Sequence, residues 1–144
     1  MSPVTLAAPV LLWYAVLNQM RPATANQGAC NMLLVSRISV SELHAMSEKM
    51  SEPLVKGVVD INQRLLVVDA EMHVDQEQLL LESGSIQADL WGINLWPGQF
   101  GTDDFVEFDS MSNIRPWQNN RSRSVMDHDL RERIKDVVAE KVYE

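Results

Sequence analysis

The sequence predicts a single α+β domain, built on one antiparallel sheet of about four to five strands with helices packed mainly on one face. Short β-branched and aliphatic runs separated by tight turns are typical of consecutive antiparallel strands rather than of parallel βαβ units. A strong helical stripe closes the chain. The length of 144 residues and the apolar content of 46% are sufficient for one hydrophobic core.

Residues 1–31 differ from the rest, and we expect them to be an extension of a domain that spans residues 32–144. Residues 6–17 are almost purely apolar, yet this run is too short to cross a bilayer as a helix. Three interpretations stay open: a docked or loosely ordered extension, a start-site artefact with the native start at Met32, or an export signal. The export signal lacks the basic residues that normally precede its apolar run.

The first strand and the first helix are expected between residues 32 and 50. Residues 32–38 are aliphatic and β-branched, which is typical of a short strand. Ser39 or Ser41 can cap a helix over residues 40–50. Three apolar side chains of this helix are spaced to share its buried face: Leu43, Met46 and Met50.

A hairpin and a short helix are expected next. Residues 55–69 hold two apolar arms around a turn at residues 62–63, and because this turn lacks glycine, one bent strand is the alternative. Asp75 stands where an N-cap residue is expected, and Gly84 stands where a left-handed residue ends a helix. We therefore favour a helix over residues 76–83, with a strand as the alternative.

The last elements are two strands, a polar loop and a closing helix. Residues 86–96 are apolar on both faces, which is typical of a central strand covered by two layers, and a second strand is expected over residues 104–111. Residues 113–123 show no apolar period and predict a loop with at most one helical turn. Asp127 caps a final helix whose apolar side chains form one stripe: Leu130, Ile134, Val137, Val138 and Val142.

Composition excludes several function classes. The formal net charge of −8 argues against general nucleic-acid binding, because phosphate binding draws on a basic surface. The single cysteine, Cys30, excludes an internal disulfide framework, so we expect a cytoplasmic location. No membrane span, phosphate-binding loop, dinucleotide fingerprint or zinc pattern is present, so no cofactor is expected. Nothing in the sequence indicates an oligomeric state.

The loop over residues 113–123 is the main candidate site. It concentrates three arginines in an acidic chain, together with amide and aromatic side chains. The arginines either pair with acids of the fold or grip an anionic ligand or a partner protein, since guanidinium groups bind carboxylates and phosphates bidentately. The candidate ligand-binding residues are Arg115, Trp117, Gln118, Asn120, Arg121 and Arg123.

Two further residues are candidates for proton transfer, His73 and Glu107. If extended, Glu71, His73 and Asp75 would share one strand face and could hold a divalent metal. We favour the simpler interpretation, in which His73 orients a bend and Asp75 caps a helix. No metal site is therefore expected.

The motifs of the chain resemble those of a small bacterial family known only as a domain of unknown function. The resemblance covers about residues 32–142 and implies one small domain without an established activity. This chain departs from the family pattern at Ala70, Ser112 and Met126. The matching motifs are similar to E-x-H-x-D at Glu71, His73 and Asp75, to G-S-x-Q-x-D-L-W-G-x-N from Gly84 to Asn94, and to N-I-R-P-x-Q-x-N-R-S from Asn113 to Ser122.

Three functional hypotheses follow from the sequence. The first is a binding or regulatory module whose polar loop receives an anionic ligand or a partner protein. The second is an enzyme acting on a substrate that bears a phosphate or a carboxylate. There the arginines neutralise charge while His73 or Glu107 transfers a proton. The third is that the polar loop is purely structural.

Overall fold

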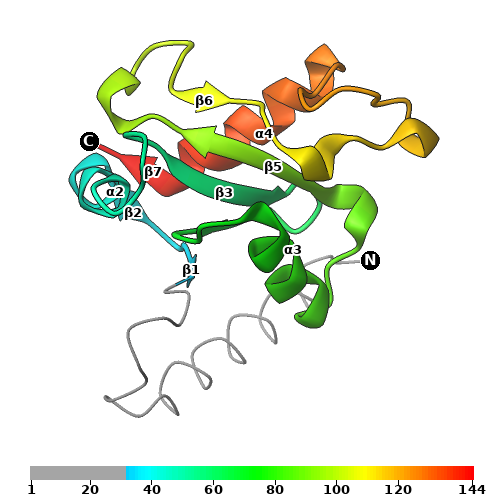
Figure 1. Cartoon of the computed structure of the whole chain (residues 1–144), viewed down its shortest axis with the longest axis horizontal. Coiled ribbons are helices and arrows are strands. Elements are labelled where there is room, and N and C mark those ends of the chain that lie inside the picture. Colours follow the sequence, from blue (N-terminus) through cyan, green and yellow to red (C-terminus); the bar gives the residue numbers. More distant parts are fainter. Residues whose placement is uncertain (1–31) are drawn as a thin grey trace.

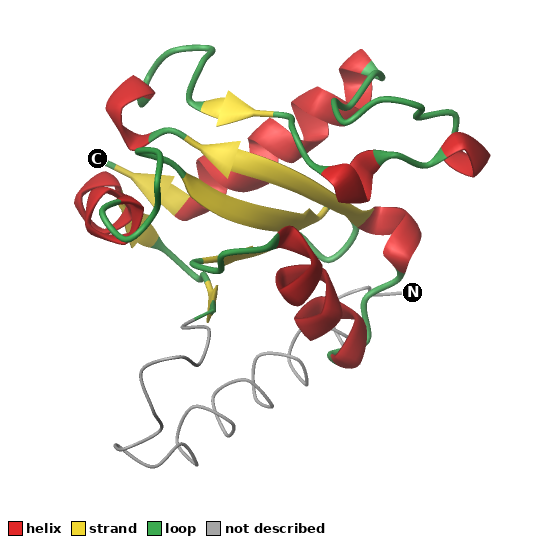
Figure 2. Ribbon diagram, in the orientation of Figure 1, coloured by secondary structure: helices red, strands yellow, loops and turns green. Residues whose placement is uncertain are grey.

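The computed structural model of the protein describes residues 32–144, so the expectations for residues 1–31 lie outside the described part of the chain. The predicted α+β class is confirmed (Figures 1 and 2). The helices and strands in chain order are β1 (Leu33–Leu34), β2 (Ile38–Ser39), α2 (Val40–Ser47), β3 (Val55–Asp60), β4 (Leu65–Val68), α3 (His73–Glu82), β5 (Leu90–Leu95), β6 (Val106–Glu107), α4 (His128–Lys141) and β7 (Val142–Tyr143).

The main sheet has five antiparallel strands in the order β1-β4-β3-β5-β6, so β3 is its central strand. The predicted hairpin is confirmed, because β3 and β4 pair around a turn in which Arg64 takes the left-handed conformation that a glycine would otherwise supply. Lys56 of β3 lies directly opposite Asn94 of β5. A separate parallel pair, β2 with β7, ties the C-terminus to the start of α2.

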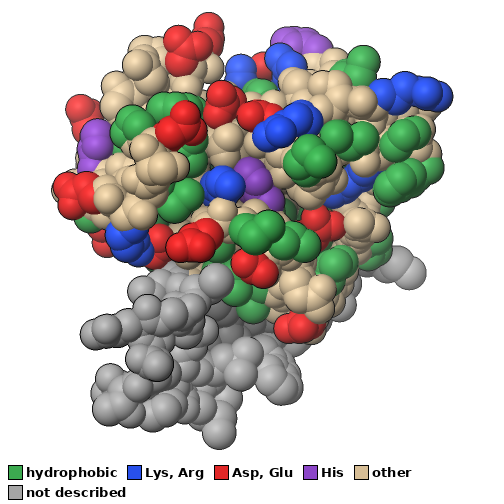
Figure 3. Space-filling view, viewed as in Figure 1, with side chains coloured by type: hydrophobic (Ala, Val, Ile, Leu, Met, Phe, Trp, Pro, Cys, Tyr) green, Lys and Arg blue, Asp and Glu red, His purple; other side chains and the backbone are tan. Residues whose placement is uncertain are grey.

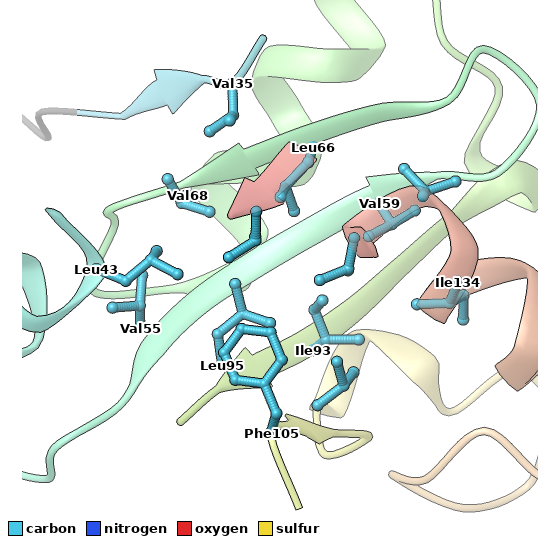
Figure 4. Close-up of a cluster of buried hydrophobic side chains, with 14 of the residues drawn as sticks. Val35, Leu43, Val55, Val59, Leu66, Val68, Ile93, Leu95, Phe105 and Ile134 are labelled. Carbon is cyan, nitrogen blue, oxygen red and sulfur yellow. The ribbon is translucent and has the colours of Figure 1, made fainter. Parts of the chain in front are cut away.

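One face of the sheet is a continuous apolar core covered by α2 and α4 (Figure 4). Val55 and Val59 of β3 point to this face, and Ile93 and Leu95 of β5 lie beside them. The predicted stripe of α4 supplies Ile134, Val137 and Val138, and α2 adds Leu43. The predicted Asp127 cap is confirmed, because its carboxylate accepts from the amides of Asp129 and Leu130.

The other face carries α3 and is apolar over only part of its area. Val58, Leu65, Val67 and Leu90 pack against Leu80 of α3. Further along the same face, strand alternation places Lys56 and Asn94 instead of aliphatic residues. The sheet therefore has one apolar face and one face that is divided between a small core and a polar floor.

The first two helices differ in detail from the sequence expectations. Ser39 caps α2 through a reciprocal bond pair with Glu42, as expected, but this helix ends at Ser47 rather than near residue 50. The helix expected at residues 76–83 is confirmed as α3, yet it begins at His73. Asp75 was expected to be its N-cap, and this is wrong, because the chain already enters the helix at Met72.

The strands after α3 are shorter than expected. The expected strand at residues 86–96 begins only at Leu90, because residues 87–89 form a 3-10 turn. The strand expected over residues 104–111 is reduced to β6. Beyond β6, the side-chain amide of Asn113 takes over the edge of β5, donating to the Gly92 carbonyl and accepting from the Gly92 amide at 2.9 and 2.8 Å.

The chain passes close to β5 at this point because residue 92 is glycine. A Cβ at Gly92 would lie 2.6 Å from the Cβ of Ser110, which is closer than packed carbon atoms approach. The segment that follows contains two 3-10 turns, at residues 111–113 and 116–118, and the second lies inside the expected loop over residues 113–123. The second ends at Asn119, which adopts a left-handed φ of 59°.

Candidate functional site

A cleft of about 800 Å³ opens on the α3 face of the sheet. Its floor is formed by β3 and β5, one wall by α3, and the opposite wall by the segment over residues 109–123. Figure 3 shows a histidine and a basic side chain side by side near the middle of this face, with acidic and apolar side chains around them. The cleft therefore lies where the sheet face changes from apolar to polar.

Lys56 and Asn94 form the floor. Asn94 is 6% exposed, and its Nδ2 donates to a carboxylate oxygen of Glu107 at 2.9 Å. Because a carboxylate accepts hydrogen bonds, this contact fixes the orientation of the Asn94 amide. Its Oδ1 is buried and has no hydrogen-bond partner among the described residues. Lys56 as a residue is half-buried, and its ammonium forms no ion pair with any described residue.

His73 is the first residue of α3 and lines the cleft above the floor. Its Nε2 lies 2.7 Å from the backbone oxygen of Ile93. A carbonyl oxygen only accepts, so Nε2 carries the hydrogen and Nδ1 of the neutral ring keeps a lone pair. Burial lowers the pKa of His73 below its ordinary value; the bond to Ile93 opposes this effect, and the nearby charge of Lys56 adds to it.

Arg115 is a buried brace at one end of the cleft. Its side chain is 1% exposed, and its Nε and Nη1 donate to the backbone oxygens of Ser112 and Gln87 at 2.9 and 2.8 Å. The guanidinium stacks over the ring of Trp91, 4.7 Å from its centroid. Nη2 lies 3.9 Å from the Glu77 carboxylate and makes no hydrogen bond to any residue that the structure describes. Burial lowers the pKa of Arg115, and Glu77 opposes this shift.

The other two arginines of the loop lie in exposed positions. Arg123 lines the cleft and donates to the Asp109 carboxylate at 2.6 Å, with both side chains about half exposed. Arg121 is exposed, lies away from the cleft lining and makes no ion pair or hydrogen bond within residues 32–144. The three cations expected to act together are thus separated into one buried, one paired and one outlying residue.

Of the remaining candidates in the loop, two hold the loop in place and one is exposed at the edge of the cleft. Asn120 is buried, and its Nδ2 donates to three backbone carbonyls, so it holds the loop together. Gln118 bridges the Ala88 carbonyl and the Arg115 guanidinium. Trp117 is 72% exposed and lines the rim of the cleft. Glutamine and asparagine therefore serve the loop geometry, and the tryptophan faces outward.

Glu107 lies apart from His73. Its carboxylate accepts from Asn94 Nδ2 and, at 3.0 Å, from Trp96 Nε1. It lines a separate cavity of about 360 Å³ next to Asp103 and Asp104. The two proton-transfer candidates are therefore not brought into one site.

No metal centre or membrane helix is present in the described part of the chain. Among residues 32–144, no cluster of three or more histidine, cysteine, aspartate or glutamate side chains could hold an ion. In the same range, no helix is both long and apolar enough to cross a bilayer.

The sequence interpretation missed the two floor residues. Lys56 stands in the run VKGVVD, which reads as a strand whose polar residue faces solvent. The sequence signal for Lys56 is a charged residue within an otherwise apolar run, which forms the central strand β3. Asn94 is a candidate because it lies opposite Lys56, and this pairing is known only once the sheet register is known.

Comparison with known proteins gives one match. Residues 32–141 match the model of a family described as a protein of unknown function, DUF5674, so the chain belongs to this family. Neither the curated proteins nor the solved structures contain a match.

Proposed function

We propose that this member of the DUF5674 family binds a small ligand with an anionic group, a carboxylate or a phosphate, and that Lys56 contacts this group. One observation carries the proposal: the central strand places on the floor of a cleft an ammonium that has no ion pair with residues 32–144. The other two cations that line the cleft, Arg115 and Arg123, already face Glu77 and Asp109. Lys56 is thus the cation with its charge left for a ligand.

A half-buried lysine on the central strand calls for a physical reason. Partial removal of an ammonium from water weakens its hydration, and an anion that enters the cleft restores favourable interactions at short range. A hydrophobic residue at position 56 would extend the α3-side core of Val58 and Val67 at no such cost. Ligand binding accounts for a lysine at this position.

The start of α3 also borders the cleft. Met72, the N-cap residue, offers no side-chain acceptor to the first turn, and Met72, His73 and Val74 all line the cleft. The amino end of a helix carries a partial positive charge and attracts anions. Together with Lys56, it favours an anion at this end of the cleft over one at the Glu77 end.

The loop has a supporting role in this proposal. Arg115, Gln118 and Asn120 bond mainly to the backbone, which supports the structural interpretation for these three residues. Trp117 and Arg123 remain accessible at the cleft and are the loop residues proposed to touch a ligand.

A second candidate function is proton transfer by His73. The observation that favours it is the bond from Nε2 to Ile93, which leaves Nδ1 as the basic nitrogen of a ring that burial keeps neutral. A neutral imidazole beside an ammonium can remove a proton from a substrate whose developing charge Lys56 stabilises. Glu107, which lies at the separate cavity, has no part in this alternative.

The test compares two lysine variants by thermal unfolding in the presence of phosphate or acetate at increasing concentrations. Lys56→Met removes the proposed contact, and Lys135→Met removes the same charge on α4, which packs on the opposite face. A ligand at a hundred times its Kd stabilises a protein by about 2.7 kcal/mol, a shift we expect for wild type and Lys135→Met. An equal shift in Lys56→Met would overturn the proposal.

A further inference from the structure

Asn94 supplies a second recognition element beside Lys56. Its Oδ1 is a buried acceptor without a donor among the described residues, in a side chain that lines the cleft. Buried acceptors of this kind normally have a partner, and leaving one without a donor costs free energy. Since Nδ2 is held by Glu107, the amide cannot turn to present its donor instead. A ligand that fills this place must offer an N–H or O–H group.

The two elements are close enough for one small molecule to reach both. Lys56 and Asn94 are directly opposite each other on neighbouring antiparallel strands, and such pairs have Cβ atoms about 4.5–5.5 Å apart. An anionic group that accepts from Lys56 therefore sits next to a donor that serves Asn94. This pattern corresponds to a carboxylate with a hydroxyl or amide N–H on the adjacent carbon, whereas inorganic phosphate offers charge and an O–H donor but has no apolar part.

The rim of the cleft adds a third element, because both walls expose large apolar side chains above the polar floor. Such side chains are normally buried, and a cluster of them around a cleft indicates contact with an apolar group. The rim residues on and beside α3 are Met72, Val74 and Leu81, and those on the opposite wall are Met111, Ile114 and Trp117.

Resting on the proposed function, we infer that the ligand is a carboxylic acid with a hydrogen-bond donor on the adjacent carbon and an apolar side chain. The carboxylate accepts from Lys56, and the donor bonds Asn94 Oδ1. The side chain contacts the apolar rim, with Trp117 as its largest surface. Charge, donor and apolar group thus each have a counterpart in the cleft.

The experiment measures the affinity of the full chain for four probes by calorimetry. Leucate has all three features, isocaproate lacks the hydroxyl, lactate lacks the isobutyl group, and inorganic phosphate has charge and O–H donors but no apolar group. We expect leucate to bind most tightly, with isocaproate about tenfold weaker because one buried hydrogen bond is lost. Lactate should be at least about tenfold weaker because its apolar group is smaller.

Two variants test whether Asn94 binds the hydroxyl and whether Trp117 contacts the apolar group. Asn94→Val should bind leucate and isocaproate equally, and Trp117→Ala should reduce the preference for leucate over lactate by about threefold. Circular dichroism establishes that each variant is folded. Should Asn94→Val fail to fold, the four probes on wild type still decide the question.

The outcomes separate this inference from the proposed function. Equal affinity of wild type for leucate and isocaproate, or for leucate and lactate, overturns the inferred ligand class. Binding of phosphate alone, lost in Lys56→Met, also overturns this class while supporting the proposed anion site. Absence of binding by all four probes counts against both.

Discussion

The two faces of the sheet are built from the same strands and differ in what they contain. The α4 face is a continuous apolar core in which residues such as Val59, Ile93 and Ile134 are fully buried. On the α3 face, the alternate positions of β3 and β5 carry Lys56 and Asn94. Because neighbouring residues of a strand point to opposite sides, β3 and β5 supply the core with one set of side chains and the cleft with the other.

This difference teaches that stability and recognition can be separated within single strands. The apolar face is large enough to hold the strands in register, so the cleft floor can carry an ammonium and an amide oxygen that have no partner among the described residues. We expect substitutions on the α4 face to change unfolding without changing the cleft, and substitutions at the floor to change ligand binding.

The largest expected effect is at the α4 face. Ile134→Ala leaves a cavity beneath the sheet and should lower the free energy of unfolding by about 2–5 kcal/mol, measured by urea denaturation. Val74→Ala, at an exposed position of α3, should stay within about 0.5 kcal/mol of wild type. A similar small loss for both variants would show that the apolar face does not carry the stability assigned to it.

An intermediate effect is expected where the cleft wall meets the fold. Arg115→Lys keeps the charge but loses the guanidinium fork, so the carbonyls of Ser112 and Gln87 lose the donors of two part-buried hydrogen bonds and stability should fall by about 1–3 kcal/mol. Arg123→Lys is the matched control in the same loop, because its pair with Asp109 is exposed and should change stability by less than about 1 kcal/mol. Equal losses in the free energy of unfolding for the two variants would show that Arg115 stabilises the fold no more than Arg123 does.

The smallest effect concerns the pH dependence of stability. Because the pKa of His73 is lowered on folding, the unfolded chain binds more protons, and stability falls as pH drops below about 6.5, the ordinary pKa of histidine. Between about pH 6.5 and the lowered pKa of His73, the free energy of unfolding of His73→Gln should fall less than that of wild type. Parallel stability curves for variant and wild type would mean that His73 is not held neutral by the fold.

Local patterns predicted most of the architecture. The stripe of α4, the hairpin of β3 and β4, and the cap at Ser39 depend on residues close in sequence, and they fold as expected. The errors arise where distant residues intervene. β6 is short because the amide of Asn113 replaces a paired strand along β5, and no local pattern reveals that replacement.

The candidate site was only partly predictable for the same reason. His73, Arg115, Trp117 and Arg123 were singled out by residue type, and all four line the cleft. Which of them is buried or paired depends on carbonyls and carboxylates from other elements. Lys56 was overlooked because only the sheet order makes its strand central.

The contact between Asn113 and Gly92 has a consequence for edge-to-edge association of the sheet. An open strand edge is a template on which another chain can add a strand, and aggregation follows. Here one side chain imitates a peptide group and occupies the exposed hydrogen-bonding positions of β5. Asn113 thereby covers the part of β5 that extends beyond β6, and the following segment stays available to build a wall of the cleft.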